Sequence, residues 1–472
     1  MNPSTTNSKI RIAVISDLHV MAPALLINEG SAFQQYLDRD RKMLRESAEI
    51  LDTLVSDIVD IKPDMVLVTG DLTKDGERVS HELVASKLQR LVDAGIQVLV
   101  VPGNHDINNP DAKTFDGDTT TPTATITRSE FAELYKEMGY DDTSRRDPDT
   151  LSYCRDVNDK LTILAIDACM DRLNTFVSRG DARDHCKASG SLEASTQQWL
   201  VDQAARATAS GRRVIAMMHH HLVPHFHMED TLAAPYMVDD AGQLCQRLVD
   251  AGVHVIFTGH LHISDISQTN LRQGQMVEIA TAAAVGYPCQ WRIASCNPTS
   301  GKLQLRTCTL HSLPSDPDFS ERSRDIFVNC IPTMTHGVLT RYWPEISQAI
   351  GNYRNKHAFV MRYVNLPDSP AKIADMLLKH LQEPATKIYI AFAEGNEGGT
   401  DNLALVEQLI GGVNRVVDEV TRGILRPLAK AALRLRVYGI ARLVLRSILE
   451  DRNDIGTKHE SVINDHTAIV NL

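Results

Sequence analysis

The stretch Val98-Leu99-Val100-Val101-Pro102-Gly103-Asn104-His105-Asp106 decides how the rest of the chain is interpreted. Its four apolar residues predict a short buried strand, which Pro102-Gly103 ends with a sharp turn. The turn places an amide, an imidazole and a carboxylate at the carboxyl end of the strand, where open α/β sheets bind their ligands. On these residues alone, a metal-assisted reaction and a polar turn that contains a histidine by chance both remain open.

Composition narrows the class of protein. The chain has 472 residues, which predicts two domains, and its 43% hydrophobic and 23% charged residues are typical of a soluble globular protein. A net charge of -11 disfavours a protein that tracks nucleic-acid backbone, but a small phosphorylated substrate is compatible because bound metal can supply positive charge. The eight scattered cysteines form no CxxC, the first residues are polar, and no apolar run is long enough to span a membrane. We expect a cytoplasmic protein with reduced thiols and no membrane span.

Other predicted strands also end in polar side chains. The strands are residues 10–15, 64–69, 213–218 and 253–258, and the motifs that follow them are Asp17-Leu18-His19, Gly70-Asp71, His219-His220-His221 and Gly259-His260-Leu261-His262. Residues two apart in extended chain point to the same side, so Asp17 and His19 are expected to reach one ion. Predicted helices at 40–60 and 77–94 separate the strands 10–15, 64–69 and 98–101. This order indicates a parallel sheet with helices outside.

The remaining pattern predicts the end of this domain and a second one. Further strands are predicted at 151–157, 161–166, 277–281, 289–296 and 303–310, helices at 128–138, 191–209 and 242–251, and polar loops at 107–127, 140–150 and 170–190. The composition changes at 311–318, so we predict domains at 1–315 and 316–472. The second is expected to be helical, with helices at 338–351, 370–383, 401–422 and 425–449, a turn-rich stretch at 352–369, and loosely held residues from about 451 to 472.

The candidate ligands form one chemical set. They are Asp17, His19, Asp71, Asn104, one of His219 and His220, His260 and His262. Carboxylates, imidazoles and an amide without thiolates suit Zn²⁺, Fe or Mn²⁺ more than Ca²⁺. Seven ligands exceed what one tetrahedral ion takes, so two ions are implied, with one carboxylate bridging them.

This series of motifs resembles the calcineurin-like metallophosphoesterase superfamily over roughly residues 10 to 310. The resemblance implies an α/β fold, a β-sandwich flanked by helices (αββα), here with a smaller helical C-terminal domain. It implies two metal ions, one held by Asp17, His19, Asp71 and His262, the other by Asp71, Asn104, His219 or His220, and His260. Many members have a proline close to the middle histidine, but here Pro224 follows only after Leu222-Val223. Both His219 and His220 therefore remain candidates.

The resemblance also implies a reaction. A hydroxide bridging the metals would attack the phosphorus atom in line. His105 would donate a proton to the leaving oxygen or stabilise its charge. Asp106 would orient His105 or a neighbouring ligand, or would only stabilise the turn.

The substrate class follows from a closer likeness within the superfamily. The motif spacing and the Gln198-Trp199-Leu200 helix look most like class III cyclic-nucleotide phosphodiesterases, so we expect hydrolysis of cyclic nucleotides or other small phosphodiesters. The alternatives are a phosphomonoesterase or pyrophosphatase, a repair-type nuclease and a non-catalytic scaffold. The acidic charge and the lack of a long coiled-coil insertion disfavour the nuclease, and the complete ligand set disfavours the scaffold.

The helical region is expected to serve in docking or in homo-oligomer formation and not as a second active site. It shows no ligand spacing and no glycine-rich phosphate loop. Within 425–449, an apolar stripe formed by Leu428, Ala432, Leu435 and Leu443 must be buried somewhere. The same segment is basic, which keeps binding to a membrane surface or an anionic partner open.

Overall fold

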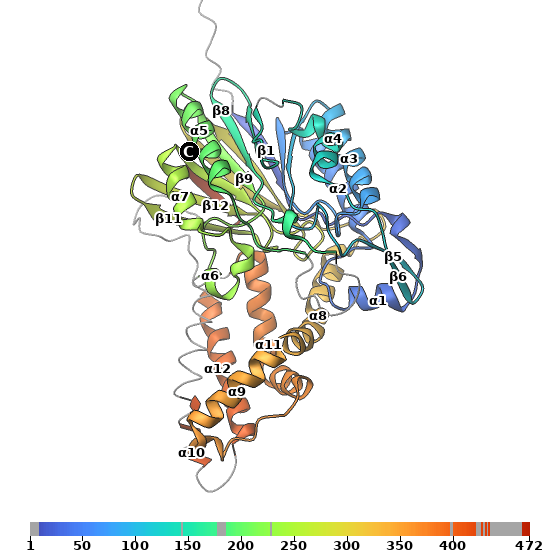
Figure 1. Cartoon of the computed structure of the whole chain (residues 1–472), viewed down its shortest axis with the longest axis vertical. Coiled ribbons are helices and arrows are strands. Elements are labelled where there is room, and N and C mark those ends of the chain that lie inside the picture. Colours follow the sequence, from blue (N-terminus) through green and yellow to red (C-terminus); the bar gives the residue numbers. More distant parts are fainter. Residues whose placement is uncertain are drawn as a thin grey trace, which may run out of the picture. The chain divides into compact units, whose positions relative to one another are not determined.

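The structure is a computed structural model that describes residues 9–142, 145–176, 186–226, 229–396, 400–421, 426–427, 430–431, 433–434 and 465–472. Its contacts divide the chain into two compact units (Figure 1). The first contains residues 1–34, 42–323 and 452–472, and the second contains residues 35–41 and 324–451. The domain boundary predicted at residue 315 stays a prediction, and the last residues of the chain group with the first unit.

Two six-stranded sheets form the body of the first unit. One has the order β15 (Thr467–Asn471), β14 (Lys302–Thr309), β13 (Gln290–Asn297), β1 (Ile10–Ile15), β3 (Met65–Thr69) and β4 (Gln97–Val101). The other has the order β11 (Asp265–Leu271), β12 (Gly274–Ala280), β10 (Val253–Thr258), β9 (Arg213–Met218), β8 (Leu161–Ile166) and β7 (Tyr153–Asp156). A small third sheet contains β2 (Leu26–Asn28), β5 (Lys113–Asp116) and β6 (Thr119–Pro122), so part of the predicted loop 107–127 is a hairpin.

Helices cover the outer faces of the two sheets (Figure 1). On one side lie α2 (Ser47–Ile61), α3 (Arg78–Asp93) and α4 (Arg128–Leu134); on the other, α5 (Ala194–Ala209) contacts β8 and β9, and α7 (Ala241–Asp250) contacts β10 and β12. In α7, the buried Leu244, Cys245, Leu248 and Val249 follow the spacing of one helical face. The predicted α/β fold class is confirmed.

Parallel pairing brings the strand ends to one edge. In the first sheet β1 pairs in parallel with β3, and β3 pairs in parallel with β4, with Thr69 opposite Val101. In the second sheet β9 pairs in parallel with β10. All five residues of β3 are buried, as expected for a strand covered on both faces. Polar residues that directly follow these strands therefore meet at the same edge.

The C-terminal strand corrects one prediction. Residues 465–472 are not loosely held, because β15 pairs antiparallel with β14 and places Leu303 opposite Val470. Ala468, Val470 and Leu472 are buried while the residues between them are exposed, a period-two alternation that the prediction overlooked. The helical unit is thus inserted in the sequence between β14 and β15.

The described residues of the second unit are mostly helical. Most of its residues form α8 (Phe319–Arg341, which begins in the first unit), α9 (Trp343–Lys356), α10 (Ala358–Met361), α11 (Pro370–Glu394) and α12 (Thr400–Val420). The predicted helix 338–351 crosses the break between α8 and α9 at Tyr342. Helix α11 continues beyond Pro384, where the prediction ended it, because the later residues Ile388 and Phe392 are buried. Most of the predicted helix 425–449 lies outside the described residues.

The remaining short elements occur in the connections. They are α1 (Ser31–Leu37), α6 (Glu229–Leu232), and the 3-10 turns η1 (Pro23–Leu25), η2 (Lys136–Met138), η4 (Asp171–Leu173) and η5 (Ala234–Tyr236). A search of the described helices found none with the length and apolar character that crossing a membrane requires.

Candidate metal centre

The predicted ligands lie at the tips of five strands. Asp17 and His19 follow β1, Asp71 follows β3, and Asn104 follows β4. From the second sheet, the His219–His221 run follows β9, and His260 and His262 follow β10. All are buried except His262, whose side chain is 11% exposed. The two sheets therefore contribute carboxylates and imidazoles to one buried region.

The backbone at these tips is left-handed and not extended. Five of the predicted ligands have a positive φ: Asp17 (50°), His19 (37°), Asp71 (49°), His260 (72°) and His262 (64°). Non-glycine residues rarely adopt this region, and such strain concentrates at functional sites. We expected an extended chain to point Asp17 and His19 to the same side. The two side chains do converge, but the reason is wrong because the backbone is left-handed.

One group of side chains surrounds the first candidate position. Asp17, His19, Asp71 and His262 each place a ligand atom within 4.8 Å of the others. The Nε2 atoms of His19 and His262 are 3.2 Å apart, Nε2 of His262 is 3.2 Å from Oδ1 of Asp17, and Nε2 of His19 is 3.5 Å from Oδ2 of Asp71. A single proton cannot satisfy two facing imidazole nitrogens and two carboxylates, whereas a metal ion can. The residues fit a cation.

A second group shares Asp71 with the first. Asp71, His219 and His260 also place ligand atoms within 4.8 Å of one another. Nε2 of His219 lies 3.1 Å from Oδ1 of Asn104 and 3.4 Å from Oδ2 of Asp71. Burial opposes a positive charge on His219, but the carboxylates of Asp71 and Asp17 raise the pKa of its imidazole to about 9.

Hydrogen bonds to backbone carbonyls fix which histidine nitrogens face this group. Nδ1 of His219 donates to the Thr69 carbonyl at 2.9 Å, so Nε2 is the nitrogen that faces Asp71 and Asn104. Nε2 of His260 lies 3.0 Å from the Ala188 carbonyl and 3.2 Å from the Pro235 carbonyl, which leaves Nδ1 as its ligand atom. Histidines that bind metals usually donate their other ring nitrogen in this way.

His220 lies beside the second group and is not one of its members. Its Nε2 donates to the Ala188 carbonyl at 3.0 Å, and burial together with His219 lowers the pKa of His220 to about 3. Of the two histidines that the sequence left open, the structure brings His219 to Asp71 and Asn104.

His105 is at the edge of the centre and has a carboxylate partner that the sequence analysis missed. Its side chain is 26% exposed, its backbone N–H donates to Oδ1 of Asp71 at 3.0 Å, and its Nδ1 lies 3.0 Å from Oδ1 of Asp75. Asp75 in turn pairs with the buried Lys74, which also lies 2.9 Å from Glu77. Burial alone would raise the pKa of Asp75, but Lys74 and His105 hold it below the ordinary value. The position of Asp75, four residues after Asp71 and just before Gly76, was the available sequence signal.

The Asp106 carboxylate hydrogen-bonds the backbone of two loops and not the imidazole of His105. Its carboxylate accepts hydrogen bonds from the backbone N–H groups of Leu72 at 3.1 Å, Thr73 at 3.0 Å and Gly103 at 2.8 Å. These contacts tie the turn after β4 to the residues that directly follow Asp71. Of the roles considered for Asp106, the structure supports stabilising the turn and holding a neighbouring ligand's loop.

Comparisons with known proteins identify the family through one match. A search of curated proteins found no significant match. Among solved structures, a dimetal phosphatase from Danio rerio matches with 15% identity and a TM-score of 0.43, over 64% of this chain and 96% of that one. An NAD nucleotidase from Haemophilus influenzae matches with 12% identity and a TM-score of 0.33, over 68% of this chain and 56% of that one. The family model for calcineurin-like phosphoesterases matches residues 10–264, more than half of the sequence. The chain therefore belongs to the calcineurin-like phosphoesterase family.

Proposed function

We propose that this protein is a dinuclear-metal phosphodiesterase that acts on cyclic nucleotides or other small phosphodiesters. The observation that carries the proposal is the pair of ligand groups that share Asp71. Asp17, His19, Asp71 and His262 would hold one ion, and Asp71, Asn104, His219 and His260 the other. Mn, Fe and Zn suit this set of oxygen and nitrogen donors.

When bound, two such ions lower the pKa of a water molecule and neutralise charge that develops on the phosphoryl oxygens. The protein's own residues orient the metal ligands and the proposed proton donor. Asp71 holds the two groups together, and the carbonyls of Thr69 and Ala188 fix the histidine tautomers. His105, partly exposed at the edge and oriented by Asp75, would donate a proton to the leaving oxygen.

The choice of diester over monoester is tested with a small substrate panel. Metal-reconstituted protein should hydrolyse bis-(p-nitrophenyl) phosphate and a cyclic nucleotide faster than p-nitrophenyl phosphate. Activity confined to the monoester would replace the proposal with a phosphomonoesterase, and activity confined to a pyrophosphate would replace it with a pyrophosphatase.

The bridging role of Asp71 is tested in the same assay. Asp71→Asn should abolish hydrolysis and lower the metal content, because an amide cannot bridge two cations as an anion. A variant that keeps two metals and turns over normally would contradict the bridging assignment.

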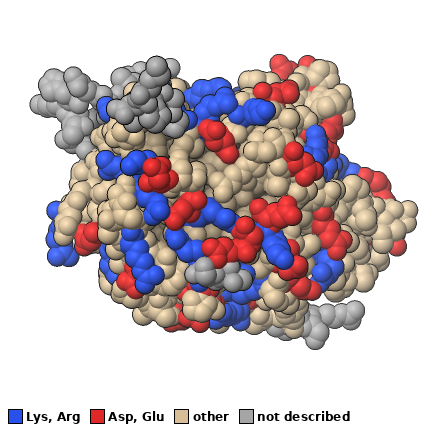
Figure 2. Space-filling view, turned by 90° about the horizontal axis from the view of Figure 1, so that it is seen from above, with Lys and Arg blue, Asp and Glu red and all other residues tan. Residues whose placement is uncertain are grey.

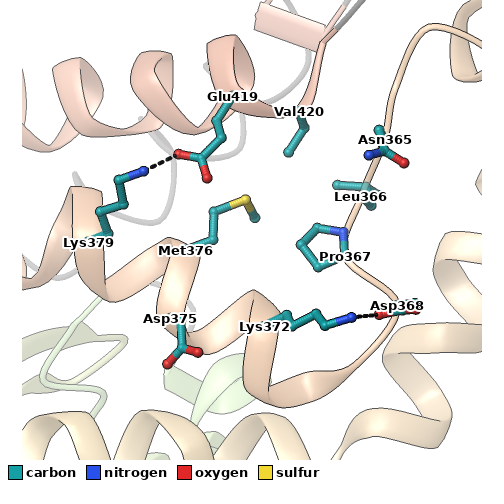
Figure 3. A pocket seen from close by; sticks show the side chains of 10 residues that line it. All are labelled: Asn365, Leu366, Pro367, Asp368, Lys372, Asp375, Met376, Lys379, Glu419 and Val420. Atoms are coloured by element: carbon teal, nitrogen blue, oxygen red, sulfur yellow. Dashed lines mark hydrogen bonds and ion pairs between the residues drawn. The ribbon is translucent and has the colours of Figure 1, made fainter.

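We propose that the helical unit serves in docking or self-association. Among the described residues, three clusters of histidines and carboxylates could hold a metal ion, and all three lie in the first unit. A pocket in the helical unit is lined by charges that pair with each other: Lys372 with Asp368 at 2.8 Å and Lys379 with Glu419 at 2.9 Å (Figure 3). Light scattering of the full chain tests self-association, which a monomer at all concentrations would contradict.

The proposed partners do not include a nucleic-acid duplex. On the face seen in Figure 2, lysines and arginines alternate with aspartates and glutamates and form no continuous basic surface. A duplex-binding protein relies on many phosphate contacts from basic residues. The cytoplasmic location stays a prediction, which cell fractionation would test.

A further inference from the structure

A second buried cluster of charged residues supports the loops of the metal centre. We call it the anchoring cluster, and its members are His221, His225, Glu229, Asp265, Glu278, Arg292 and Asp465. Three of these, His221, His225 and Glu278, place ligand atoms within 4.8 Å of one another. All four ring nitrogens of the two histidines already have a carboxylate or carbonyl partner, so the hydrogen-bonding capacity of both imidazoles is satisfied within the cluster.

His221 joins the two loops that carry His219 and His260. Its Nε2 donates to the carbonyl of Gly259 at 2.8 Å, directly before His260. Its Nδ1 lies 2.9 Å from Oε1 of Glu229. The Gly259 N–H donates to the carbonyl of His219 at 3.1 Å, so the loops are connected at two points. A displaced His221 would separate two predicted ligands of the second ion.

Glu278 on β12 holds the backbone on both sides of this joint. Its Oε2 accepts from the N–H groups of Leu222 at 2.8 Å and Val223 at 2.6 Å, in the loop after β9. Its Oε1 accepts from the hydroxyl of Thr258 at 2.7 Å, at the end of β10. One carboxylate therefore fixes the exits of both strands.

His225 connects Glu278 with Asp265. Its Nδ1 is 2.5 Å from Oδ2 of Asp265, and its Nε2 is 3.3 Å from Oε1 of Glu278. Burial opposes a charge on this imidazole, but the two carboxylates raise the pKa of His225 well above the ordinary value. Its backbone N–H donates to Oε2 of Glu229 at 2.6 Å. His225 thus links the carboxylates that hold the loops.

The C-terminal segment completes the cluster from a distant part of the sequence. The side chain of Asp465 hydrogen-bonds that of Asp265 and accepts from the Ile266 N–H at 2.9 Å. The carbonyl of Asp465 accepts from Nη1 of the fully buried Arg292 at 2.5 Å and from the Thr307 hydroxyl at 3.1 Å. Strand β15 begins two residues later and pairs with β14, which fixes Asp465 in place.

We propose that Asp465 and His225 are positioning residues of the metal centre, through which the C-terminal segment 465–472 holds the loops of His219 and His260 in place. The catalytic part of this inference rests on the proposed function; the metal-binding part does not. Groups that hydrogen-bond metal ligands directly typically contribute about 10–100-fold to metal affinity or activity, and we expect an effect in this range from the cluster that holds the ligand loops.

The test compares variants of the full chain. Asp465→Ala removes the partner of Asp265 and Ile266, whereas Asp465→Asn keeps an acceptor for Ile266 and gains a donor for Asp265. Ile469→Ala is the matched control, because Ile469 is on the same strand, 50% exposed, and outside the cluster. Each metal-free protein is titrated with Mn²⁺ by calorimetry without substrate, and its metal content, kcat and KM for bis-(p-nitrophenyl) phosphate are measured.

We expect Asp465→Ala to bind Mn²⁺ about 10–100-fold more weakly and to lose kcat while KM stays within twofold, with Asp465→Asn and Ile469→Ala close to the unchanged protein. Equal Mn²⁺ binding by Asp465→Ala and Ile469→Ala would overturn the inference. So would a third metal in the unchanged protein that is lost in His225→Gln, because the cluster would then be a metal site.

Two further outcomes are decisive. If Asp465→Ala does not fold, His225→Gln carries the same expectation, and failure of both to fold would show that the cluster holds the fold and not the centre. If no phosphoester is hydrolysed by any form, the proposed function fails, but the Mn²⁺ titrations still decide the inference.

Discussion

Replacing Gly103 by alanine tests whether the GNHD turn must pass directly over Asp71. A Cβ at position 103 would lie 2.1 Å from Oδ1 of Asp71 and 2.3 Å from its backbone nitrogen. The carboxylate can rotate away, but the backbone atom cannot, so the turn and the β3 tip must move apart. Gly103 itself has no positive φ, so the substitution introduces a steric contact and no backbone strain.

The size of the displacement follows from the contact. Real Cβ atoms essentially never approach other atoms closer than 3.0 Å, so relief of the 2.3 Å contact with the Asp71 backbone nitrogen needs a shift of about 0.7 Å. A misplacement of about 1 Å at a reacting centre can reduce the rate about 10²-fold. Overpacking of this kind also costs about 1–3 kcal/mol of stability, which a folded protein can tolerate.

The assay measures kcat on bis-(p-nitrophenyl) phosphate, together with metal content by mass spectrometry. Gly103→Ala should fold, bind fewer than two metals and lose about 10²-fold in kcat. Gly242→Ala is the control, because beyond its chain neighbours and the backbone of its own helix α7 nothing lies within 4 Å of the added Cβ, and alanine favours the helix. A Gly103→Ala protein with two metals and unchanged kcat would refute the placement of the turn against Asp71.

Three other predictions follow from the same geometry. His105→Ala should keep both metals but slow hydrolysis by about 10²–10⁴-fold for esters with poor leaving groups and much less for those that release p-nitrophenolate. The measurement is kcat across esters of different leaving-group pKa. An equal loss for all esters would argue against proton donation. Lys74→Ala leaves Asp75 and Glu77 buried without their shared cation and should lower the free energy of unfolding in urea by about 3–5 kcal/mol. Lys372 is exposed, so Lys372→Ala should leave the free energy of unfolding unchanged. Similar urea midpoints for the two lysine variants would contradict the importance of the buried pairing of Lys74. Chelation should lower the melting temperature, because an ion present at about 100 times its Kd stabilises the folded state by about 2.7 kcal/mol; identical melting curves with and without chelator would mean that no ion binds.

The sequence predicted the strand tips and the ligand types because both depend on local patterns. Apolar runs such as 98–101 identify buried strands, and parallel strands bring the residues that follow them to a shared edge. The choice between His219 and His220 could not be made this way, since neighbouring residues differ only in direction at the exit of a strand. Asp75 was missed because its contact with His105 depends on tertiary folding, and its position four residues after Asp71 was the one local signal.

The C-terminal segment shows a second limit of pattern reading. Residues 465–472 form a short edge strand whose partner, β14, is separated from it by the whole helical unit. No local pattern specifies a pairing at that distance along the chain. Only the alternation of Ala468, Val470 and Leu472 indicated a strand, and its short length made it easy to overlook.

The backbone of the centre explains why ligand placement must be fixed by the protein. A non-glycine residue with left-handed backbone costs about 1–2 kcal/mol, and five of the predicted ligands adopt this backbone. Hydrogen bonds between the tips help to hold this conformation: Asp17 N–H to the Gly70 carbonyl at 3.1 Å, His19 N–H to the Asp71 carbonyl at 2.9 Å, and His260 N–H to Oδ2 of Asp17 at 3.0 Å. These bonds join the tips of β1, β3 and β10, so these three tips are held against one another. The sheets and these hydrogen bonds therefore hold the ligands in place before a metal ion binds.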